Sequence, residues 1–274
     1  MTLIIHNIKE LHGILSADVN CLKGSQMAAV DHIRNAFLVE KNGLIADFGQ
    51  MDHNGLKPLM EKYTEAKTLD ACQGLVLPSF ADAHTHLVYA ASRELEYVDK
   101  IKGLSYEEIA KRGGGILNSA GAMHKADEQQ LFDEALERLS EIAKMGTASV
   151  EIKSGYGLTT DSELKMLRVI RRLKSESPLA IKASFLGAHA VPLDYKGRQS
   201  EYVDLIINEM IPMVATEELA DFVDVFCDRG FFTVEDTDRI LNAGMKYGLR
   251  AKIHANELDY SGGIQVGVKY NAVS

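Results

Sequence analysis

Residues 75–87 read LVLPSFADAHTHL, an apolar run that ends in two histidines separated by one residue. Side chains two positions apart in an extended strand point to the same face, so His84 and His86 place their imidazoles about 6 to 7 Å apart along one face. Imidazole is a ligand for zinc, iron, copper and nickel. The pair therefore predicts part of a metal site at the end of a buried strand.

After residue 75, short apolar strands alternate with amphipathic helices. Strands are predicted at 75–86, 147–153, 180–187, 222–227 and 249–254, with the start of another at 271–274. The residues from Thr160 to Glu163 have the pattern of a capping box, which predicts that one of the helices begins there. This alternation predicts an α/β fold with a parallel sheet, and its spacing fits a TIM-like (β/α)8 barrel or a doubly wound sheet.

The segment before residue 75 has a different pattern, with short apolar runs at 36–40 and 44–48. Between them lies Asn42-Gly43, a strong signal for a tight hairpin because both residues accept a positive φ. We therefore predict two domains: a small antiparallel β segment over 1–74, and a parallel α/β domain over 75–274.

Composition excludes several classes of partner. The 274 residues carry a formal net charge of -9, which argues against nucleic acid and anionic membranes. No apolar segment is long enough to span a bilayer, and the N-terminus lacks the features of a signal peptide. The three cysteines are too few and too widely spaced for a disulfide framework. We therefore expect a cytoplasmic protein, and a homodimer is an allowed assembly.

Several polar residues follow the predicted strands, and in a barrel these strand ends form the rim where active sites lie. His254 ends the strand at 249–254 and is a candidate third metal ligand. Glu257, three residues later, is either a general acid/base or a solvated loop carboxylate. His189 follows the strand at 180–187 as a ligand or as a donor that polarises a substrate carbonyl.

Three further residues are candidates for the functional site. Arg93 lies just past the histidine pair, and its guanidinium suits a substrate carboxylate, although a structural ion pair is equally common. Tyr156 sits in a glycine-flanked turn that would expose its ring and hydroxyl. Lys153 ends a strand either as a carbamate that bridges two metals or as a plain rim lysine.

At this point a resemblance is evident. The sequence resembles the metal-dependent amidohydrolase superfamily and, within it, the imidazolonepropionase family. The matching segments are Asp82–Val88, Gly113–Ile116, Val150–Gly157, Phe185–Pro192, Asp224–Cys227 and Lys252–Ala255. The resemblance implies a TIM-like barrel together with a small N-terminal β-sandwich.

The resemblance also implies an activity, namely hydrolysis of 4-imidazolone-5-propanoate to N-formimidoyl-L-glutamate in histidine degradation. One divalent metal, zinc or iron, would be held by His84, His86, His254 and an aspartate on the eighth barrel strand. Arg93 would bind the propionate of the substrate. The imidazolone ring would be lined by Tyr156, His189 and Glu257, and either of the last two would move protons to the ring nitrogen.

The sequence departs from the family pattern at its end. The family continues past Asn271-Ala272-Val273-Ser274 into the remaining barrel strands, so we expect a C-terminally truncated barrel of five to six strands that lacks the aspartate ligand. Two alternatives to the imidazolonepropionase activity remain. One is the activity of another cyclic amidase or deaminase of the superfamily. The other is a non-catalytic fragment. For the 274-residue chain alone we expect little activity and substoichiometric metal.

Overall fold

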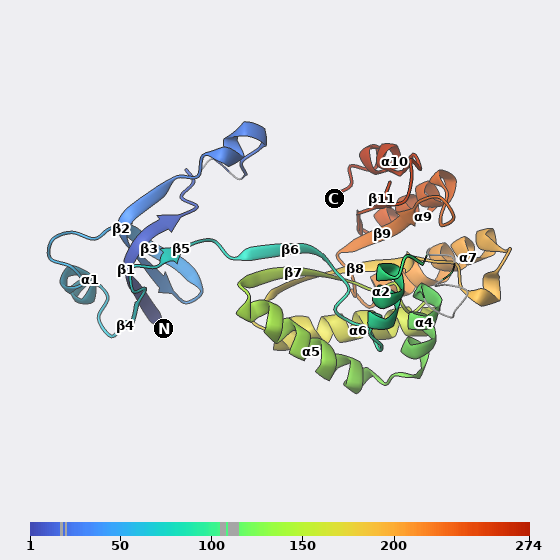
Figure 1. The fold of residues 1–274 in the computed structure, drawn as a ribbon, viewed down its shortest axis with the longest axis horizontal. Coiled ribbons are helices and arrows are strands. Elements are labelled where there is room, and N and C mark those ends of the chain that lie inside the picture. Colours follow the sequence, from blue (N-terminus) through green and yellow to red (C-terminus); the bar gives the residue numbers. More distant parts are fainter. Residues whose placement is uncertain (17–18, 20, 105–107, 109–114) are drawn as a thin grey trace. The chain divides into compact units, whose positions relative to one another are not determined.

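The computed structural model describes residues 1–16, 19, 21–104, 108 and 115–274, which form two compact units, Met1–Ser79 and Phe80–Ser274 (Figure 1). Gly113 and Gly114 of the motif noted above lie outside the described residues. The sequence predicted the boundary five residues earlier, after residue 74. The difference arises because strand β5 (Leu75–Val76) pairs with strand β1 (Thr2–His12) and so belongs to the first unit.

The first unit contains a five-stranded sheet in the order β3-β2-β1-β4, with β5 also paired to β1. Its other strands are β2 (His32–Lys41), β3 (Leu44–Gln50) and β4 (Lys67–Asp70), and its helices are α1 (Lys57–Lys62) and a 3-10 turn (Gly24–Ala28). The predicted hairpin joins β2 and β3 through Asn42 and Gly43, with φ angles of 54° and 84°. The order of strands describes one sheet rather than two packed sheets in the part of this unit that the structure describes, so the expected β-sandwich is not confirmed.

The antiparallel prediction for this unit is only partly correct. The strand β2 is antiparallel to both of its neighbours, β1 and β3, whereas β4 and β5 run parallel to β1. The sequence did not indicate this mixture, because neither short strand is joined to β1 by a tight turn.

The second unit is built on a parallel sheet, as predicted. Its strands are β6 (Phe80–Thr85), β7 (Thr147–Lys153), β8 (Ala180–Ala188), β9 (Phe222–Cys227), β10 (Arg250–Ala251) and β11 (His254–Ala255). The order is β6-β7-β8-β9, and both β10 and β11 pair with β9 as two pieces of a fifth strand. Val273 N donates to Ala251 O at 2.9 Å, so the end of the chain lies beside this fifth strand.

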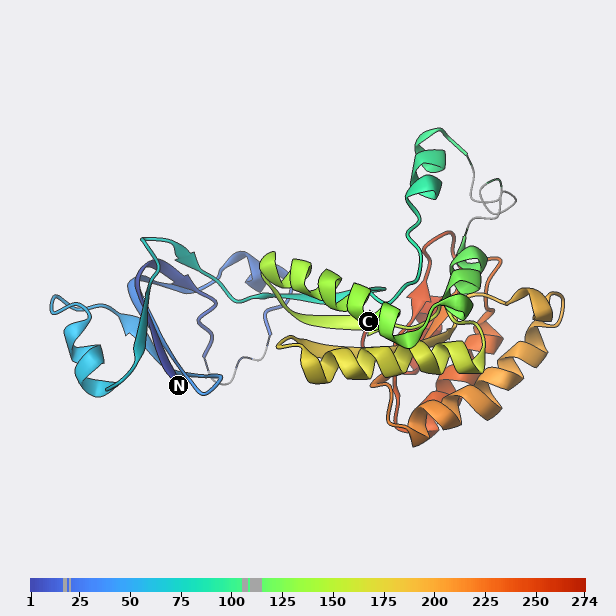
Figure 2. The same ribbon diagram turned by 90° about the horizontal axis from the view of Figure 1, so that it is seen from below.

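Helices connect the strands, and several of them cover one face of the sheet. They are α2 (Glu94–Ile101), α4 (Ile116–Lys125), α5 (Glu128–Lys144), α6 (Thr160–Glu176), α7 (Gln199–Leu205), a π-helix (Ile206–Met210), α8 (Ile211–Thr216), α9 (Val234–Lys246) and α10 (Gly263–Lys269), with a 3-10 turn at Leu193–Tyr195. The helices α5, α6 and α9 contact β7, β8 and β9 respectively, and α5 and α6 run side by side in both views (Figures 1 and 2). Among the described residues, none of these helices has the length and apolar character that a bilayer crossing requires.

The two faces of the sheet differ sharply in chemistry because successive strand residues point to opposite sides. Val150 and Ile152 of β7 belong to the large apolar cluster beneath the helices. The residues that alternate with them, Glu151 and Lys153, are buried on the opposite face. Burial of each large apolar side chain stabilises such a unit by about 1.5 to 3 kcal/mol, so the helix-covered face supplies the stability and leaves the other face free for polar groups.

The sheet curls around this polar face. In a flat sheet, the first and fifth strands would lie about 19 Å apart. Here Lys252 Nζ, at the fifth strand, lies 3.1 Å from the carbonyl oxygen of Ala83 on β6. Such a contact requires a strongly curved sheet, which brings the carboxyl ends of all its strands together.

Candidate metal centre

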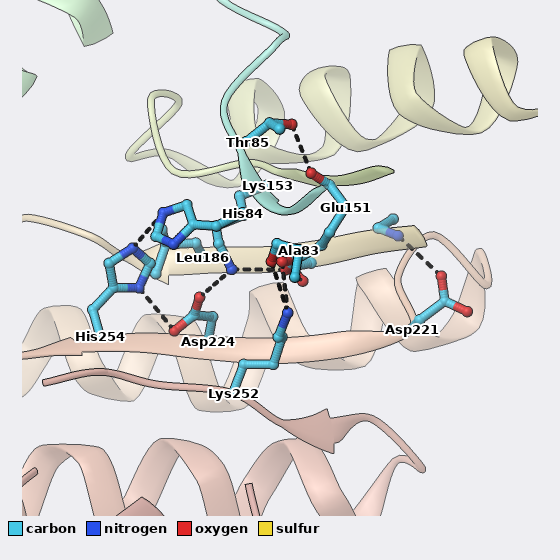
Figure 3. A network of polar contacts seen from close by, with 12 residues as sticks. Ala83, His84, Thr85, Glu151, Lys153, Leu186, Asp221, Asp224, Lys252 and His254 are labelled. Carbon is cyan, nitrogen blue, oxygen red and sulfur yellow. Dashed lines mark hydrogen bonds and ion pairs between the residues drawn. The ribbon is translucent and has the colours of Figure 1, made fainter. Parts of the chain in front are cut away.

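Three histidines meet at the carboxyl end of the curled sheet. His84 lies on β6, His86 follows that strand directly, and His254 begins β11. One ring nitrogen from each lies within 4.8 Å of the others, and the Nε2 atoms of His84 and His254 are 3.1 Å apart (Figure 3). The structure therefore brings together the three residues that the sequence nominated as metal ligands.

The ring chemistry fits a metal ion. Burial, with a smaller effect from neighbouring histidines, lowers the pKa of His84 and lowers the pKa of His86 well below its ordinary value. Both rings are thus neutral at pH 7, which is the form that binds metals. His86 Nδ1 is also buried without a hydrogen-bond partner among the described residues, a costly state for a polar atom unless a ligand engages the ring.

The strand that carries the histidine pair is fixed locally by hydrogen bonds. Thr85 Oγ1 donates to the carbonyl oxygen of Glu151 on β7 at 2.6 Å, and His84 N donates to Asp82 Oδ1 at 3.2 Å. Because successive side chains of a strand alternate between its two faces, His84 and His86 lie on the face opposite to Thr85. The ring centroids of His84 and His86 lie 5.5 Å apart, close to the spacing that strand alternation predicts.

Behind the histidines lies a buried ionic network (Figure 3). His254 Nδ1 lies 3.1 Å from Asp224 Oδ1, and Lys153 Nζ donates to Asp224 Oδ2 and to Glu151 Oε1, both at 2.7 Å. Lys252 Nζ donates to the second Glu151 oxygen at 2.6 Å. Neither alternative for Lys153 is correct: it is an interior ammonium between two carboxylates, where a carbamate anion would be repelled.

His189 stacks on His86, with ring centroids 5.3 Å apart, but it is not part of the ligand cluster. Its Nδ1 lies 2.9 Å from the carbonyl oxygen of Gly155. A carbonyl only accepts, so Nδ1 carries the proton and Nε2 is an acceptor while the ring is neutral. Burial lowers the pKa of His189 to about 4, so the predicted role as a donor to a substrate carbonyl does not fit the state of this ring at pH 7.

The turn that carries Tyr156 is held by a buried carboxylate. Glu163 Oε1 accepts from the backbone N–H groups of Gly157 and Leu158 at 2.7 and 2.9 Å, and Oε2 accepts from Gly155 at 2.9 Å. The predicted capping box is therefore wrong: α6 is capped by Thr159, which accepts from Ser162 N, and Glu163 serves the turn instead. The Tyr156 ring lies 5.1 Å from His86.

Gly155 has a conformation and a position that exclude other residues. Its φ is 109°, and a Cβ there would lie 2.9 Å from His189 Nδ1. The absence of a side chain thus permits the close approach of His189 to the turn that positions it.

A cavity of about 480 Å³ opens over the histidines. It is lined by His84, His86, Arg93, Lys100, Ile116, His189, Phe226, Phe231, His254, Glu257 and Leu258. Arg93 is half-buried and donates from Nε to Glu96 Oε2 at 2.8 Å, so it makes the ion pair that the sequence left as an alternative and also faces the cavity. Glu257 is exposed at the cavity wall, so both of its proposed roles remain predictions.

The loop of Glu257 is anchored by Asp228 at the end of β9. Asp228 Oδ2 accepts from the backbone N–H groups of Glu257 and Leu258 at 2.7 and 2.9 Å. Burial would raise the pKa of Asp228, but these and other backbone hydrogen bonds lower it. An ionised carboxylate therefore fixes the backbone at the cavity rim.

Sequence reasoning missed four residues that build this site from behind: Glu151, Glu163, Asp224 and Lys252. For three of them a signal existed, because charged residues at alternate positions of otherwise apolar strands indicate a polar interior face. Glu163 gave no such signal, since its position in the capping pattern was sufficient to explain it.

Comparisons with known proteins find relatives by sequence and by fold. No family model matches the sequence. An imidazolonepropionase of Christiangramia forsetii is 48% identical over 274 residues, which cover 100% of this chain and 65% of that protein. Among solved structures, 5-methylcytosine deaminase from Klebsiella pneumoniae, liganded with 5-fluorocytosine, has a TM-score of 0.62 at 16% identity over 98% of this chain and 55% of its own.

Another solved structure shows the same fold at greater distance. A mutant atrazine chlorohydrolase from Arthrobacter aurescens, complexed with zinc and atraton, has a TM-score of 0.54 at 11% identity over 98% of this chain and 56% of its own. The structural likenesses show the fold alone, whereas the aligned region of the sequence relative covers every segment that carries the candidate metal centre. Along its whole length, the chain is therefore homologous to the imidazolonepropionases, and it spans about 65% of the length of these relatives.

Proposed function

We propose that this protein hydrolyses 4-imidazolone-5-propanoate to N-formimidoyl-L-glutamate, a step of histidine degradation. The observation that carries the proposal is the three-histidine cluster, whose ring nitrogens lie within 4.8 Å of one another in a chain homologous to imidazolonepropionases. In this reaction water hydrolyses the ring amide: the C–N bond breaks and the ring opens, the carbonyl carbon gains the hydroxyl and the ring nitrogen gains the proton.

The histidines would hold one divalent metal, zinc or iron, since neutral imidazole binds both. Such a metal would lower the pKa of a bound water and polarise the carbonyl of the substrate. The histidine rings themselves stay unprotonated at pH 7 because burial lowers the pKa of His84 and His86. The site is thus ready to accept a cation without first losing protons.

The cavity residues suit the two ends of this substrate. Arg93 presents a guanidinium for the propionate carboxylate. His189 Nε2 is an acceptor that would orient a ring N–H of the imidazolone. We assign Tyr156, whose ring lies beside those of His86 and His189, to the same substrate site. Glu257 at the rim is the carboxylate we assign to proton transfer toward the ring nitrogen.

The same proposal extends to architecture and compartment. Residues 273–274 pair with the fifth strand, since Val273 N donates to Ala251 O and Ile253 N donates to Ser274 O, and this is the position of the next strand in a TIM-like barrel. The cysteines Cys21, Cys72 and Cys227 are all unpaired, which suits a reducing cytoplasm.

A substrate panel tests the proposal. The protein is loaded with Zn²⁺ or Fe²⁺ and offered 4-imidazolone-5-propanoate, 5-methylcytosine and a cyclic amide without a carboxylate, with products identified by mass spectrometry. We expect N-formimidoyl-L-glutamate, formed at a low rate, from the first compound only. Release of ammonia from 5-methylcytosine with the imidazolone left intact would overturn the assignment in favour of a deaminase.

A further inference from the structure

The polar face of the sheet buries four charged side chains that do not reach the cavity. Glu151, Lys153, Asp224 and Lys252 are each at most 4% exposed. Two carboxylates and two ammonium groups balance in charge, yet apolar residues of similar volume often serve stability as well as or better than a buried ion pair. The presence of this network at the base of the metal centre therefore calls for a functional reason.

The network ends on both sides of the histidine cluster. At one end Asp224 Oδ1 contacts His254 Nδ1 at 3.1 Å. At the other end Lys252 Nζ donates to the carbonyl oxygen of Ala83, the residue before His84, at 3.1 Å. Figure 3 shows these contacts joining β6, β7 and β9 with the segment that leads into β11.

The contact with Asp224 determines which nitrogen of His254 carries a proton. Asp224 is paired with an ammonium group, since its Oδ2 accepts from Lys153 Nζ at 2.7 Å, and this pairing is that of an ionised carboxylate. An ionised carboxylate only accepts, so His254 Nδ1 must donate. Nε2 is then left with its lone pair, and it faces His84 Nε2 at 3.1 Å.

Asp224 is itself held in one orientation. Lys153 Nζ binds its other oxygen, Oδ2, at 2.7 Å, and Lys153 is fixed in turn by Glu151. A carboxylate with both oxygens engaged cannot rotate away from the imidazole. Such partners of metal-binding histidines set ring orientation and ligand basicity.

We propose that Asp224 is the positioning residue for His254: it holds the Nδ1–H form of the ring, clamped by Lys153, so that Nε2 is aimed at the metal centre before a metal arrives. This inference rests on the metal centre of the proposed function, but it does not depend on the identity of the substrate. Its observable consequences are the proton position on His254 and the affinity for metal.

The first experiment measures the proton position in the unaltered, metal-free protein by ¹⁵N NMR of the histidine rings. The His254 signals are identified by their loss in His254→Gln. We expect a protonated Nδ1 and an unprotonated Nε2 at pH 7. A protonated Nε2 with an unprotonated Nδ1 would overturn the proposal, whatever the variants do.

The second experiment measures Zn²⁺ affinity by competition with a chelating dye. In Asp224→Ala we expect affinity to fall by about 10- to 100-fold, as is typical when a ligand loses its hydrogen-bond partner. The matched control is Ser184→Ala, which removes a buried donor to Glu151 on the same face; within the described part of the chain, the Ser184 side chain makes no hydrogen bond to Asp224 or His254. We expect Ser184→Ala to change stability but not Zn²⁺ affinity.

The outcomes separate this inference from the proposed function. A folded Asp224→Ala protein that binds Zn²⁺ as tightly as the unaltered protein overturns the role of Asp224. If Asp224→Ala does not fold, the proton position on His254 in the unaltered protein still shows whether the proposal for Asp224 is correct. Absence of Zn²⁺ binding in a protein whose His254 carries its proton on Nδ1 counts against the metal centre and not against the action of Asp224.

Discussion

His84 and His254 are 170 positions apart in the sequence, yet their Nε2 atoms lie 3.1 Å apart in the structure. The contact joins the first and fifth strand positions of a parallel sheet. Two rings this close repel each other when both are protonated, and the neighbouring charge of His254 contributes, after burial, to the lowered pKa of His84. The curl of the sheet thus creates a place where one added cation would be bound by both rings.

Removal of one ligand should abolish tight metal binding. In His84→Ala we expect Zn²⁺ affinity to fall by at least about 100-fold, because loss of a ligand costs more than the 10- to 100-fold typical for loss of a ligand's hydrogen-bond partner. Equilibrium dialysis with metal analysis measures the effect. His53→Ala, at an exposed position of the first unit, is the control and should bind as the unaltered protein does. Equal binding by His84→Ala would place the metal elsewhere.

Acid should destabilise the metal-free protein through His189. Burial lowers its pKa from 6.5 to about 4. Above pH 6.5 the ring is neutral in both states and adds no pH dependence. Between these values the unfolded chain binds a proton that the folded chain does not, so the free energy of unfolding falls as pH falls, by about 1.4 kcal/mol per pH unit and about 3 kcal/mol in all.

His189→Asn tests whether the loss of stability in acid comes from His189. The asparagine amide can still donate to the carbonyl oxygen of Gly155. Urea unfolding at several pH values between 7 and 4 should show a shallower loss of stability in the variant than in the unaltered protein. His86 contributes in the same direction and remains present in both. Parallel pH profiles for the two proteins would show that His189 does not titrate in this way.

Glu163 should stabilise the protein as a carboxylate, and a side-chain amide of the same size should not replace it. Both of its oxygens accept backbone N–H groups of the 155–158 turn. In Glu163→Gln an NH₂ group must replace one oxygen and face a donor, which should cost about 1 to 3 kcal/mol. Urea unfolding measures the loss, and Asp161→Asn, exposed in the first turn of the same helix, should stay within about 0.5 kcal/mol of the unaltered protein. An equally small effect of Glu163→Gln would show that the turn does not need the charge.

The sequence predicted those parts of the molecule that depend on local pattern. Alternating strands and helices gave the parallel sheet, and the strand-end positions of His84, His86 and His254 identified residues that the structure brings together. Interactions between distant segments were not predictable in the same way. Leu75 and Val76 look like the start of the first strand of the second unit, yet they pair with β1 because Pro78 interrupts the run.

Side-chain direction was the other limit. The segment Thr160–Glu163 fits a capping box, but only the position of the 155–158 turn in space decides that Glu163 binds backbone amides there. Similarly, Lys153 could be placed at a strand end from the sequence. That it lies between Glu151 and Asp224 depends on how three strands align.

Arg93 should govern recognition of the carboxylate of the substrate. It lines the cavity while its Nε is bound to Glu96, so the planar guanidinium is fixed in orientation before a ligand enters. In Arg93→Ala we expect the binding of 4-imidazolone-5-propanoate to weaken by about 10- to 100-fold, since a hydrogen bond to a charged group contributes about 1.5 to 3 kcal/mol. Arg93→Lys should restore only part of this, because an ammonium cannot form the two parallel bonds of a guanidinium. Calorimetric titration compares these variants with Lys100→Ala, which removes an exposed cation from the wall of the same cavity. If Lys100→Ala weakens binding more than Arg93→Ala does, the propionate lies on the other side of the cavity.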